Sequence, residues 1–508
     1  MSTGAALVAV LLVSAVTLAV GTFGLRLSRT TSDFYVASRT VGSVTNASAI
    51  GGEYLSAASF LGVAGLVLSR GVDSLWYPVG WTAGYLVLLV FVAAPLRRSG
   101  AYTLPDFAQL RVESMAARGV SSALVVLIGV LYLVPQFQGA GLTMRTLTGA
   151  PPWVGEVTVA VVVLVIVASG GMRSITLVQA FQYWLKLFAL LLPACFLLVA
   201  WRGDDAPGTS RLSAAAWVEP LTGPHELYLT YSLIVATFLG TMGLPHVVVR
   251  FYTNRDGRAA RRTTVAVLAL LSVFYLLPPL FGVLGRVYAI DLVASGRSDS
   301  VVLALPSRVI GGIAGQLLTA LLGAGAFAAF LSTSSGLVVS VAGVVSQDLL
   351  SRWLDGVLAF RVAGTACALA TLVLTVASSG LAVAHAVELA FAVAASTFCP
   401  LLMLGIWWHG LTARGAVAGM VAGGGLSTAA VLATMFGTTF TGWSGAILAQ
   451  PALITVPVAF LVMIGVSLVT PRPLHVGRTM VRLHTPEHLV LDRGSYHPEN
   501  RRTTTGTS

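Results

Sequence analysis

The chain has 508 residues, of which 56% are hydrophobic and only 10% are charged, whereas soluble domains carry about 25% charged residues. This composition excludes an ordinary soluble domain and indicates an integral membrane protein. The net charge of +11 comes from arginines scattered in short clusters, together with one lysine, Lys186, so it does not indicate a nucleic-acid-binding surface. The three cysteines lie in apolar runs without paired spacing, which predicts neither a disulfide framework nor a metal knuckle.

Apolar runs follow one another along most of the chain. A membrane-spanning helix needs about 20 predominantly apolar residues. The sequence contains about thirteen such runs, at residues 5–25, 43–69, 73–96, 119–145, 152–171, 175–201, 227–249, 264–288, 311–346, 357–378, 382–407, 413–434 and 449–470. We therefore expect a multi-pass protein of the cell membrane that contacts membrane lipids.

The placement of arginines predicts the orientation. No basic residue precedes the first run and Arg26 and Arg29 follow it, which is the reverse of a signal peptide. Because cytoplasmic loops are rich in arginine, we expect the N-terminus outside and the C-terminus in the cytoplasm. The basic cluster RFYTNRDGRAARR, residues 250–262, then lies inside. The polar tail 471–508 lacks apolar periodicity, so we expect it to be largely disordered.

The second run carries an unusual interruption. Residues 46–65 read NASAIGGEYLSAASFLGVAG, with a double glycine beside Glu53. A carboxylate at the centre of a membrane helix costs about 2.5–3.5 kcal/mol, and glycine lowers the cost of leaving helical geometry. Unwound backbone at membrane depth is tolerated where it lines a cavity or is buried in protein. Residues 50–53 are therefore predicted to break the helix.

The seventh run carries a second interruption. Gly240, Gly243 and Pro245 punctuate residues 236–251, and Pro245 removes one backbone hydrogen bond and disfavours helix at Leu244. Interrupted helices in corresponding positions of two halves indicate an inverted-repeat transporter. Runs two to six and seven to eleven would be the repeats.

Four stretches carry a family resemblance. They are SDFYVASRTVGSVTNASAIGGEYLSAASFLG (32–62), GGMRSITLVQAFQ (170–182), GTMGLPHVVVRFYT (240–253) and FLSTSSGLVVSVAGVVSQDL (330–349). In this order they resemble successive signatures of the sodium/solute symporter family, and the first and third are most similar to its cation/acetate (monocarboxylate) branch. The resemblance covers roughly residues 30–470.

The resemblance implies an all-α polytopic membrane protein with a LeuT-type inverted-repeat (5+5) core and about 13 transmembrane helices. The expected organisation is an extra N-terminal helix and cytoplasmic loop at 1–42, the ten-helix transport core at 43–410, two C-terminal helices at 411–470 and the cytoplasmic polar tail at 471–508.

The resemblance also implies a sodium site between the first broken helix and the eighth core helix. Its predicted ligands are the carbonyl oxygens of Gly52, Leu55 and Ala329 and the hydroxyls of Ser332 and Thr333. Sodium is a hard cation that prefers oxygen ligands, and unwinding frees carbonyls. The alternative is that these hydroxyls bond to carbonyls of their own helix or join two helices.

Glu53 has two interpretations. It caps amides freed at the helix break, where a helix N-terminus favours negative charge, or it tunes the cation site or exchanges a proton. A proton is accordingly the alternative coupling ion. No organic cofactor is expected.

The substrate pocket should lie between the two broken helices. Its predicted residues are Tyr54, Ala58, Tyr132, Gln136, Thr237 and Thr241. Relatives that carry proline use bulky aromatic residues where this chain places Ala58, Thr237 and Thr241. Amide and hydroxyl donors with exposed backbone N–H groups suit a small carboxylate, and we expect no arginine in the core. For Tyr132 and Gln136 the alternative is a hydrogen bond between helices.

The expected function is sodium-coupled symport of a short-chain monocarboxylate, such as acetate, propionate or pyruvate, into the cell. The alternatives are a sodium- or proton-coupled symporter of another small solute, such as proline, another amino acid or a sugar, and a membrane sensor that does not transport. No constellation of nucleophile, base and oxyanion donors indicates an enzyme, and no obligatory protein partner is evident.

Overall fold

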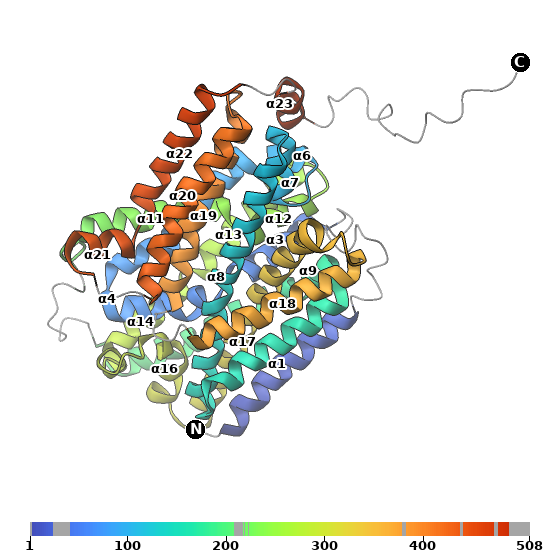
Figure 1. Cartoon of the computed structure of the whole chain (residues 1–508). Coiled ribbons are helices and arrows are strands. Elements are labelled where there is room, and N and C mark those ends of the chain that lie inside the picture. The colour runs from blue at the N-terminus through green and yellow to red at the C-terminus, as the bar shows by residue number, and fades with distance from the viewer. Residues whose placement is uncertain are drawn as a thin grey trace, which may run out of the picture.

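The computed structural model describes residues 3–23, 41–207, 217, 219–221, 223–377, 383–436, 440–471 and 476–486. Within these ranges every regular element is a helix. Figure 1 shows long helices packed into one bundle, with α23 (Val476–His484) at one end. Ten described helices are long and apolar enough to cross a membrane, and two bent pairs raise the number to 12. The predicted all-α polytopic class is confirmed.

The N-terminal half contains the helices that correspond to the first six predicted runs. They are α1 Thr3–Phe23, α3 Ser43–Tyr54, the π-helix η3 Ala58–Gly62, α4 Val63–Arg70, η4 Val72–Leu75, α5 Trp76–Val87, the π-helix η5 Leu88–Val92, α6 Ala93–Ser99, α7 Leu104–Val112, α8 Met115–Thr148 and α9 Pro152–Gly203. The fifth and sixth runs lie on the single element α9, although we predicted separate helices. Glycine costs a helix only about 1 kcal/mol relative to alanine, so the glycine pair at 170–171 need not end it.

The C-terminal half follows the same pattern. Its elements are α11 Glu226–Gly243, α12 Pro245–Val249, η7 Arg250–Thr253, α13 Gly257–Phe274, α14 Leu277–Tyr288, α15 Asp291–Ala294, η8 Ser298–Ser300, α16 Val301–Val309, α17 Gly312–Val345, the π-helix η9 Ser346–Leu350, α18 Gly356–Ala377, α19 Val383–Trp407, α20 Ala413–Phe436, α21 Gly442–Ala449, α22 Ala452–Leu468 and α23. The short elements α15, η8 and α16 between two predicted runs were not anticipated.

The first helix break lies a few residues after the predicted position. The helices Ser43–Tyr54 and Ala58–Arg70 meet at 70°, and Leu55 already has a non-helical ψ of 87°. Gly51 and Gly52 belong to α3, where a Cβ on Gly52 would lie 2.1 Å from the Gln179 carbonyl oxygen. The glycines therefore let α3 approach α9 closely, and the chain leaves helical geometry directly after this contact.

The second break lies where the sequence predicts it. Leu244 is extended, with φ −70° and ψ 118°, between α11 and α12. Gly240 and Gly243 again serve close packing, because Cβ atoms there would lie 2.5 Å from the Phe391 oxygen and 2.4 Å from the Ala394 oxygen of α19. The first helix of each predicted repeat thus packs on the fifth, α3 on α9 and α11 on α19.

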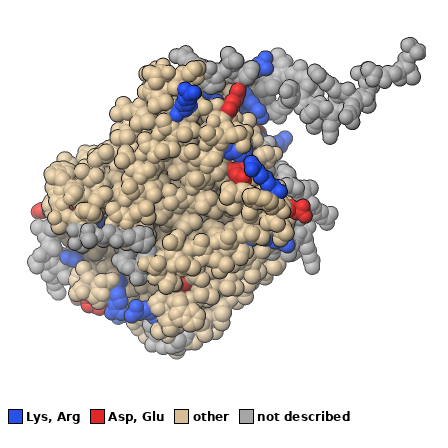
Figure 2. Space-filling view, in the orientation of Figure 1, with Lys and Arg blue, Asp and Glu red and all other residues tan. Residues whose placement is uncertain are grey.

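The surface agrees with a membrane environment. Figure 2 shows a broad face without charged side chains, which gather toward the two ends of the bundle. Val199, Val373 and Leu461 are each about 70% exposed. Apolar surface this extensive is unusual for a soluble monomer and suits contact with lipid acyl chains.

The polar tail contains one ordered element. In α23 the apolar residues Val476, Met480 and Leu483 are buried, and the His484 Nε2 atom lies 2.8 Å from the Ile406 carbonyl oxygen. Their spacing of four and three residues is helical, so α23 differs from the expected disorder over these nine residues. Residues 472–475 and 487–508 lie outside the described part.

Replacing Gly52 with alanine should destabilise the protein. The new Cβ would meet the backbone oxygen of Gln179, and overpacking of this kind costs about 1–3 kcal/mol. Thermal unfolding of the purified protein in detergent measures the effect. The matched control is Gly425→Ala on α20, where a Cβ would have no atom within 4 Å. Equal midpoints for the two variants would contradict the packing role of Gly52.

Candidate functional site

Oxygen atoms from two helices converge on the ammonium group of Lys186. Lys186 Nζ donates to the carbonyl of Leu55 at 2.7 Å, to the hydroxyl of Ser332 at 2.6 Å and to the carbonyl of Gly52. Gly52 and Leu55 flank the end of α3, and Ser332 lies in the middle of α17. The first break and α17 thus meet at the place where the sequence predicts a cation site.

The other two predicted cation ligands adjoin this cluster. Ser332 Oγ lies 3.0 Å from the Ala329 oxygen and 2.7 Å from the Gly52 oxygen. Thr333 Oγ1 donates to the carbonyl of Glu53 at 2.6 Å. Both hydroxyls therefore join α17 to α3, which is the helix-joining role that was the alternative to sodium binding. The Ser332 oxygen also accepts a hydrogen bond from Lys186.

The broken helix explains why carbonyls are available. An α-helix leaves its last four carbonyls without partners inside the helix, and α3 ends at Tyr54. The carbonyls of residues 52 to 55 face protein rather than water, and each needs a donor or a cation. These oxygens suit a hard monovalent cation, and three of them, on Gly52, Glu53 and Leu55, accept hydrogen bonds from Lys186 or the α17 hydroxyls.

Lys186 is the residue whose role the sequence does not reveal. Its side chain is fully buried. No carboxylate oxygen of the described residues lies within 4.0 Å of its nitrogen. The only signal available was its rarity, since it is the single lysine in the chain.

A buried ion pair connects the two breaks. Arg250 Nε donates to Glu53 Oε2 at 2.6 Å, and both side chains are 1% exposed. Arg250 also donates to Thr176 Oγ1 at 2.8 Å and to the Gln179 side chain. The expectation that the core lacks arginine is wrong. Arg250 follows α12 directly on η7, and the sequence placed it too far toward the cytoplasm because its loop is rich in arginine.

This cluster holds more basic than acidic side chains. Lys186 and Arg250 are basic and Glu53 is acidic, and all three are fully buried. Burying a basic group without a partner charge is costly, so the second basic side chain favours an anion nearby. The Glu53 pair links α3 to η7, which agrees with a structural role for Glu53.

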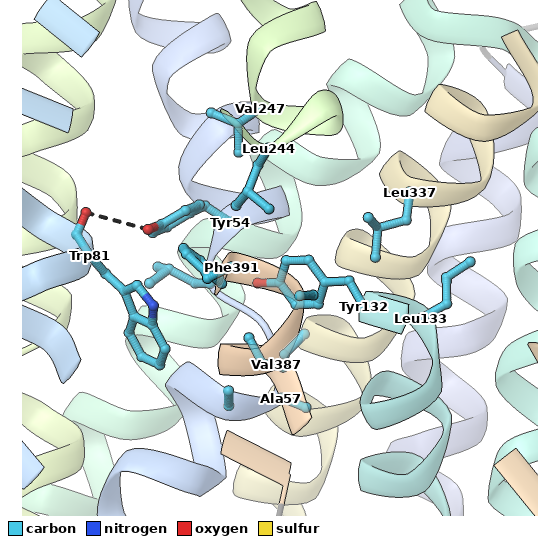
Figure 3. Close-up of a cluster of buried hydrophobic side chains, with 14 of the residues drawn as sticks. Tyr54, Ala57, Trp81, Tyr132, Leu133, Leu244, Val247, Leu337, Val387 and Phe391 are labelled. Carbon is cyan, nitrogen blue, oxygen red and sulfur yellow. Dashed lines mark hydrogen bonds between the residues drawn. The ribbon is translucent and has the colours of Figure 1, made fainter. Parts of the chain in front are cut away.

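Two of the predicted substrate residues, Tyr54 and Tyr132, lie in one buried cluster with Ala57 and Leu244 of the two breaks (Figure 3). Tyr54 OH lies 2.8 Å from Thr241 Oγ1 and 3.3 Å from the Trp81 carbonyl oxygen. Gln136 Oε1 accepts from the backbone N–H of Ala57 at 3.0 Å, so it satisfies an amide at the break. This is the interhelical bond that was the alternative for Gln136.

The small residues of the predicted pocket divide between two places. Ala58 begins η3 directly after the break and is fully buried. Thr237 Oγ1 donates to the Leu233 carbonyl at 2.8 Å, and its side chain lies against Gly80 of α5. Thr241 contacts Tyr54, and it also packs against α5, at Gly84, as Thr237 does at Gly80.

An aromatic cluster surrounds these residues and was missed in the sequence. The ring of Phe391 lies 5.8 Å from Trp81 and 5.8 Å from Tyr132, and Tyr85 lies 4.9 Å from Tyr54. Trp81 Nε1 and Tyr85 OH are buried and have no hydrogen-bond partner within the described part of the chain. Buried donors are normally satisfied, so these two are available to a small polar ligand.

A cavity opens on the side of the bundle toward α4 and η4. It has a volume of about 530 Å³, and its lining includes Arg70, Asp73, Tyr77 and His385. Tyr77 OH donates to Glu388 Oε2 at 2.6 Å. Glu388 is 1% exposed, so this hydrogen bond joins α5 to α19 inside the protein.

Sequence comparisons identify the family. The model of the sodium:solute symporter family matches residues 34–423. The chain belongs to the sodium:solute symporter family. It is also 31% identical over 500 residues to the uncharacterized symporter YwcA of Bacillus subtilis (strain 168), an alignment that covers 93% of this chain and 96% of that protein.

Solved structures show the fold of this symporter. A substrate-bound, outward-open Na+-coupled sialic acid symporter matches with a TM-score of 0.71 and 14% identity, covering 92% of this chain and 98% of that one. Mhp1, a nucleobase-cation-symport-1 family transporter, matches with a TM-score of 0.56 and 13% identity. That match covers 89% of this chain and 99% of Mhp1. The LeuT-type inverted-repeat fold is confirmed, and the chain is a transporter rather than an enzyme.

Replacing Glu53 with glutamine should destabilise the symporter strongly. The change leaves Arg250 as a buried charge without a carboxylate, and breaking a buried ion pair costs about 3–5 kcal/mol. We expect a lower thermal midpoint, partly restored by Arg250→Gln in the double variant. The control is Asp291→Asn in the exposed pair with Arg308, which should change little. Full stability of Glu53→Gln would show that the buried pair contributes nothing.

Proposed function

We propose that this symporter couples sodium entry to the uptake of a short-chain monocarboxylate such as acetate, propionate or pyruvate. The observation that carries the proposal is the presence of two buried basic side chains, Lys186 and Arg250, beside the single acidic side chain Glu53 at the first break, next to the aromatic cluster. Tyr54 of the aromatic cluster precedes Leu55 of the oxygen cluster in the chain. A small anion bound at the aromatic cluster would compensate the second basic side chain.

The oxygen cluster supports sodium as the coupling ion. Gly52, Leu55 and Ser332 offer uncharged oxygens around one point, with Ala329 and Thr333 beside them. This donor set contains no nitrogen, sulfur or carboxylate ligand, and uncharged oxygens suit a hard monovalent cation. A proton is the alternative, since Glu53 lies beside the cluster.

The aromatic cluster supports a ligand that is small and mostly apolar, with one polar end. Trp81, Tyr132 and Phe391 contribute apolar rings, and two buried donors, Trp81 Nε1 and Tyr85 OH, have no hydrogen-bond partner among the described residues. A carboxylate needs a small number of convergent donors, and its short alkyl chain needs apolar surroundings. A sugar would require many more hydrogen-bond partners than this cluster offers.

The mechanism follows from the position of the break. A cation at the cluster would neutralise the freed carbonyls and hold α3, α4 and α17 in one arrangement. Substrate then binds beside it, and rocking of one helix group against the other exposes both to the cytoplasm. A ligand shifts such an equilibrium only through its differential affinity for the two states.

Uptake of labelled acetate into proteoliposomes tests the function. We expect an inward sodium gradient to stimulate uptake, and unlabelled propionate and pyruvate to compete while proline and glucose do not. Ser332→Ala should lose most of the sodium stimulation, because it removes a ligand from the cluster. If only a proton gradient stimulates uptake, the coupling ion is a proton and not sodium. Stimulation by neither gradient would contradict acetate symport and favour another solute or a sensor.

Replacing Trp81 with phenylalanine should weaken acetate uptake. The ring remains, but the free Nε1–H donor is lost, and a hydrogen bond to a charged group contributes about 1.5–3 kcal/mol. We expect the KM for acetate to rise by about tenfold to a hundredfold. The control is Trp184→Phe on α9, whose side chain is 52% exposed. An unchanged KM in Trp81→Phe would place the carboxylate elsewhere.

A further inference from the structure

The ammonium of Lys186 is held in the way that proteins hold a bound ion. An ammonium has three N–H donors, and each of them has one acceptor here, at Gly52, Leu55 and Ser332. Two of these acceptors are carbonyls at the helix break, and the third is a hydroxyl on the facing helix. Lys186 therefore contacts three of the five oxygens that were predicted as sodium ligands.

Two cations cannot use these oxygens at the same time. A sodium ion bound to the same three oxygens would lie in contact with the Lys186 nitrogen. Both charges would be fully buried, where repulsion is far less screened than in water. The nearby Glu53 cannot compensate for both, since its Oε2 atom is already paired with Arg250.

Lys186 has the means to leave the site. Its ammonium sits on a flexible stem of four carbons, and its acceptors are neutral groups rather than a carboxylate that would hold it. Glu53 Oε1, one residue from Gly52, has no hydrogen-bond partner among the described residues. This oxygen offers an acceptor to a displaced ammonium.

We propose that Lys186 is a tethered cation that competes with sodium for the oxygens of Gly52, Leu55 and Ser332. In the ion-free protein the ammonium satisfies the carbonyls at the break and stabilises the broken helix without an ion. Sodium binds only when Lys186 withdraws, so Lys186 lowers the apparent sodium affinity. The inference rests on the cation site proposed above, and ion binding tests it separately from substrate uptake.

The test is sodium binding to the purified full-length chain. Thermal stability is followed as sodium chloride replaces choline chloride at constant ionic strength. We expect Lys186→Met, which keeps an unbranched side chain and removes the amino group, to be stabilised at sodium concentrations at least tenfold lower than wild type. Adding Ser332→Ala to this variant should reverse the gain, because it removes a shared ligand.

The control is Gln182→Met, one turn earlier on α9, where the side chain donates to Thr17 Oγ1 at 3.1 Å. Its sodium response should match wild type. Lys186→Gln, whose amide still donates to a carbonyl, is the second variant if the methionine variant does not fold. Sodium binding that is unchanged or weaker in the folded variant would overturn the proposal, because Lys186 would then not compete.

The single lysine allows a further check in the wild type. Isotope-labelled lysine gives one side-chain NMR signal, since no other lysine exists in the chain. We expect this signal to shift at sodium concentrations that stabilise the protein against heat and to stay in place in choline. A signal that does not respond at those concentrations would show that sodium binds without displacing Lys186, which contradicts the proposal.

Discussion

Unsatisfied backbone at membrane depth is the constraint on which the rest of this structure depends. When α3 ends at Tyr54, the carbonyls of its last turn lose their helical partners far from bulk water. Such groups cost several kcal/mol each if nothing binds them. The protein meets this need with groups from two other helices, namely Lys186 on α9 and the hydroxyls of Ser332 and Thr333 on α17. The same requirement creates a place where a cation can bind.

The two breaks depend on each other through buried charge. Glu53 beside the first break pairs with Arg250 directly after the second, so this buried ion pair joins the two repeats at their breaks. Lys186 adds a second buried basic side chain in the same region. Close glycine contacts hold the supporting helices near enough for these long side chains to meet. Packing, charge and the proposed ligands therefore belong to one arrangement, and a change in any of them should affect the others.

Particular residues show where reading the sequence succeeds. Pro245 marked the second break correctly, because proline acts on its own backbone and on the residue before it. The double glycine at 51–52 indicated the first break only approximately. Glycine both weakens helices and permits close packing, and the sequence does not say which effect is used. Here Gly52 lies against Gln179, and the chain turns three residues later.

The sequence by itself determined the membrane class, the two interrupted helices and the family, since these follow from local composition and from motifs in order. It also named the oxygens that gather at the first break. Only the tertiary structure decided which side chains form hydrogen bonds with these oxygens. Lys186 lies more than 130 residues from Gly52 along the chain, and Arg250 almost 200 from Glu53. Their contacts arise from how α9 and η7 pack against α3, and local sequence patterns do not predict packing between such distant segments.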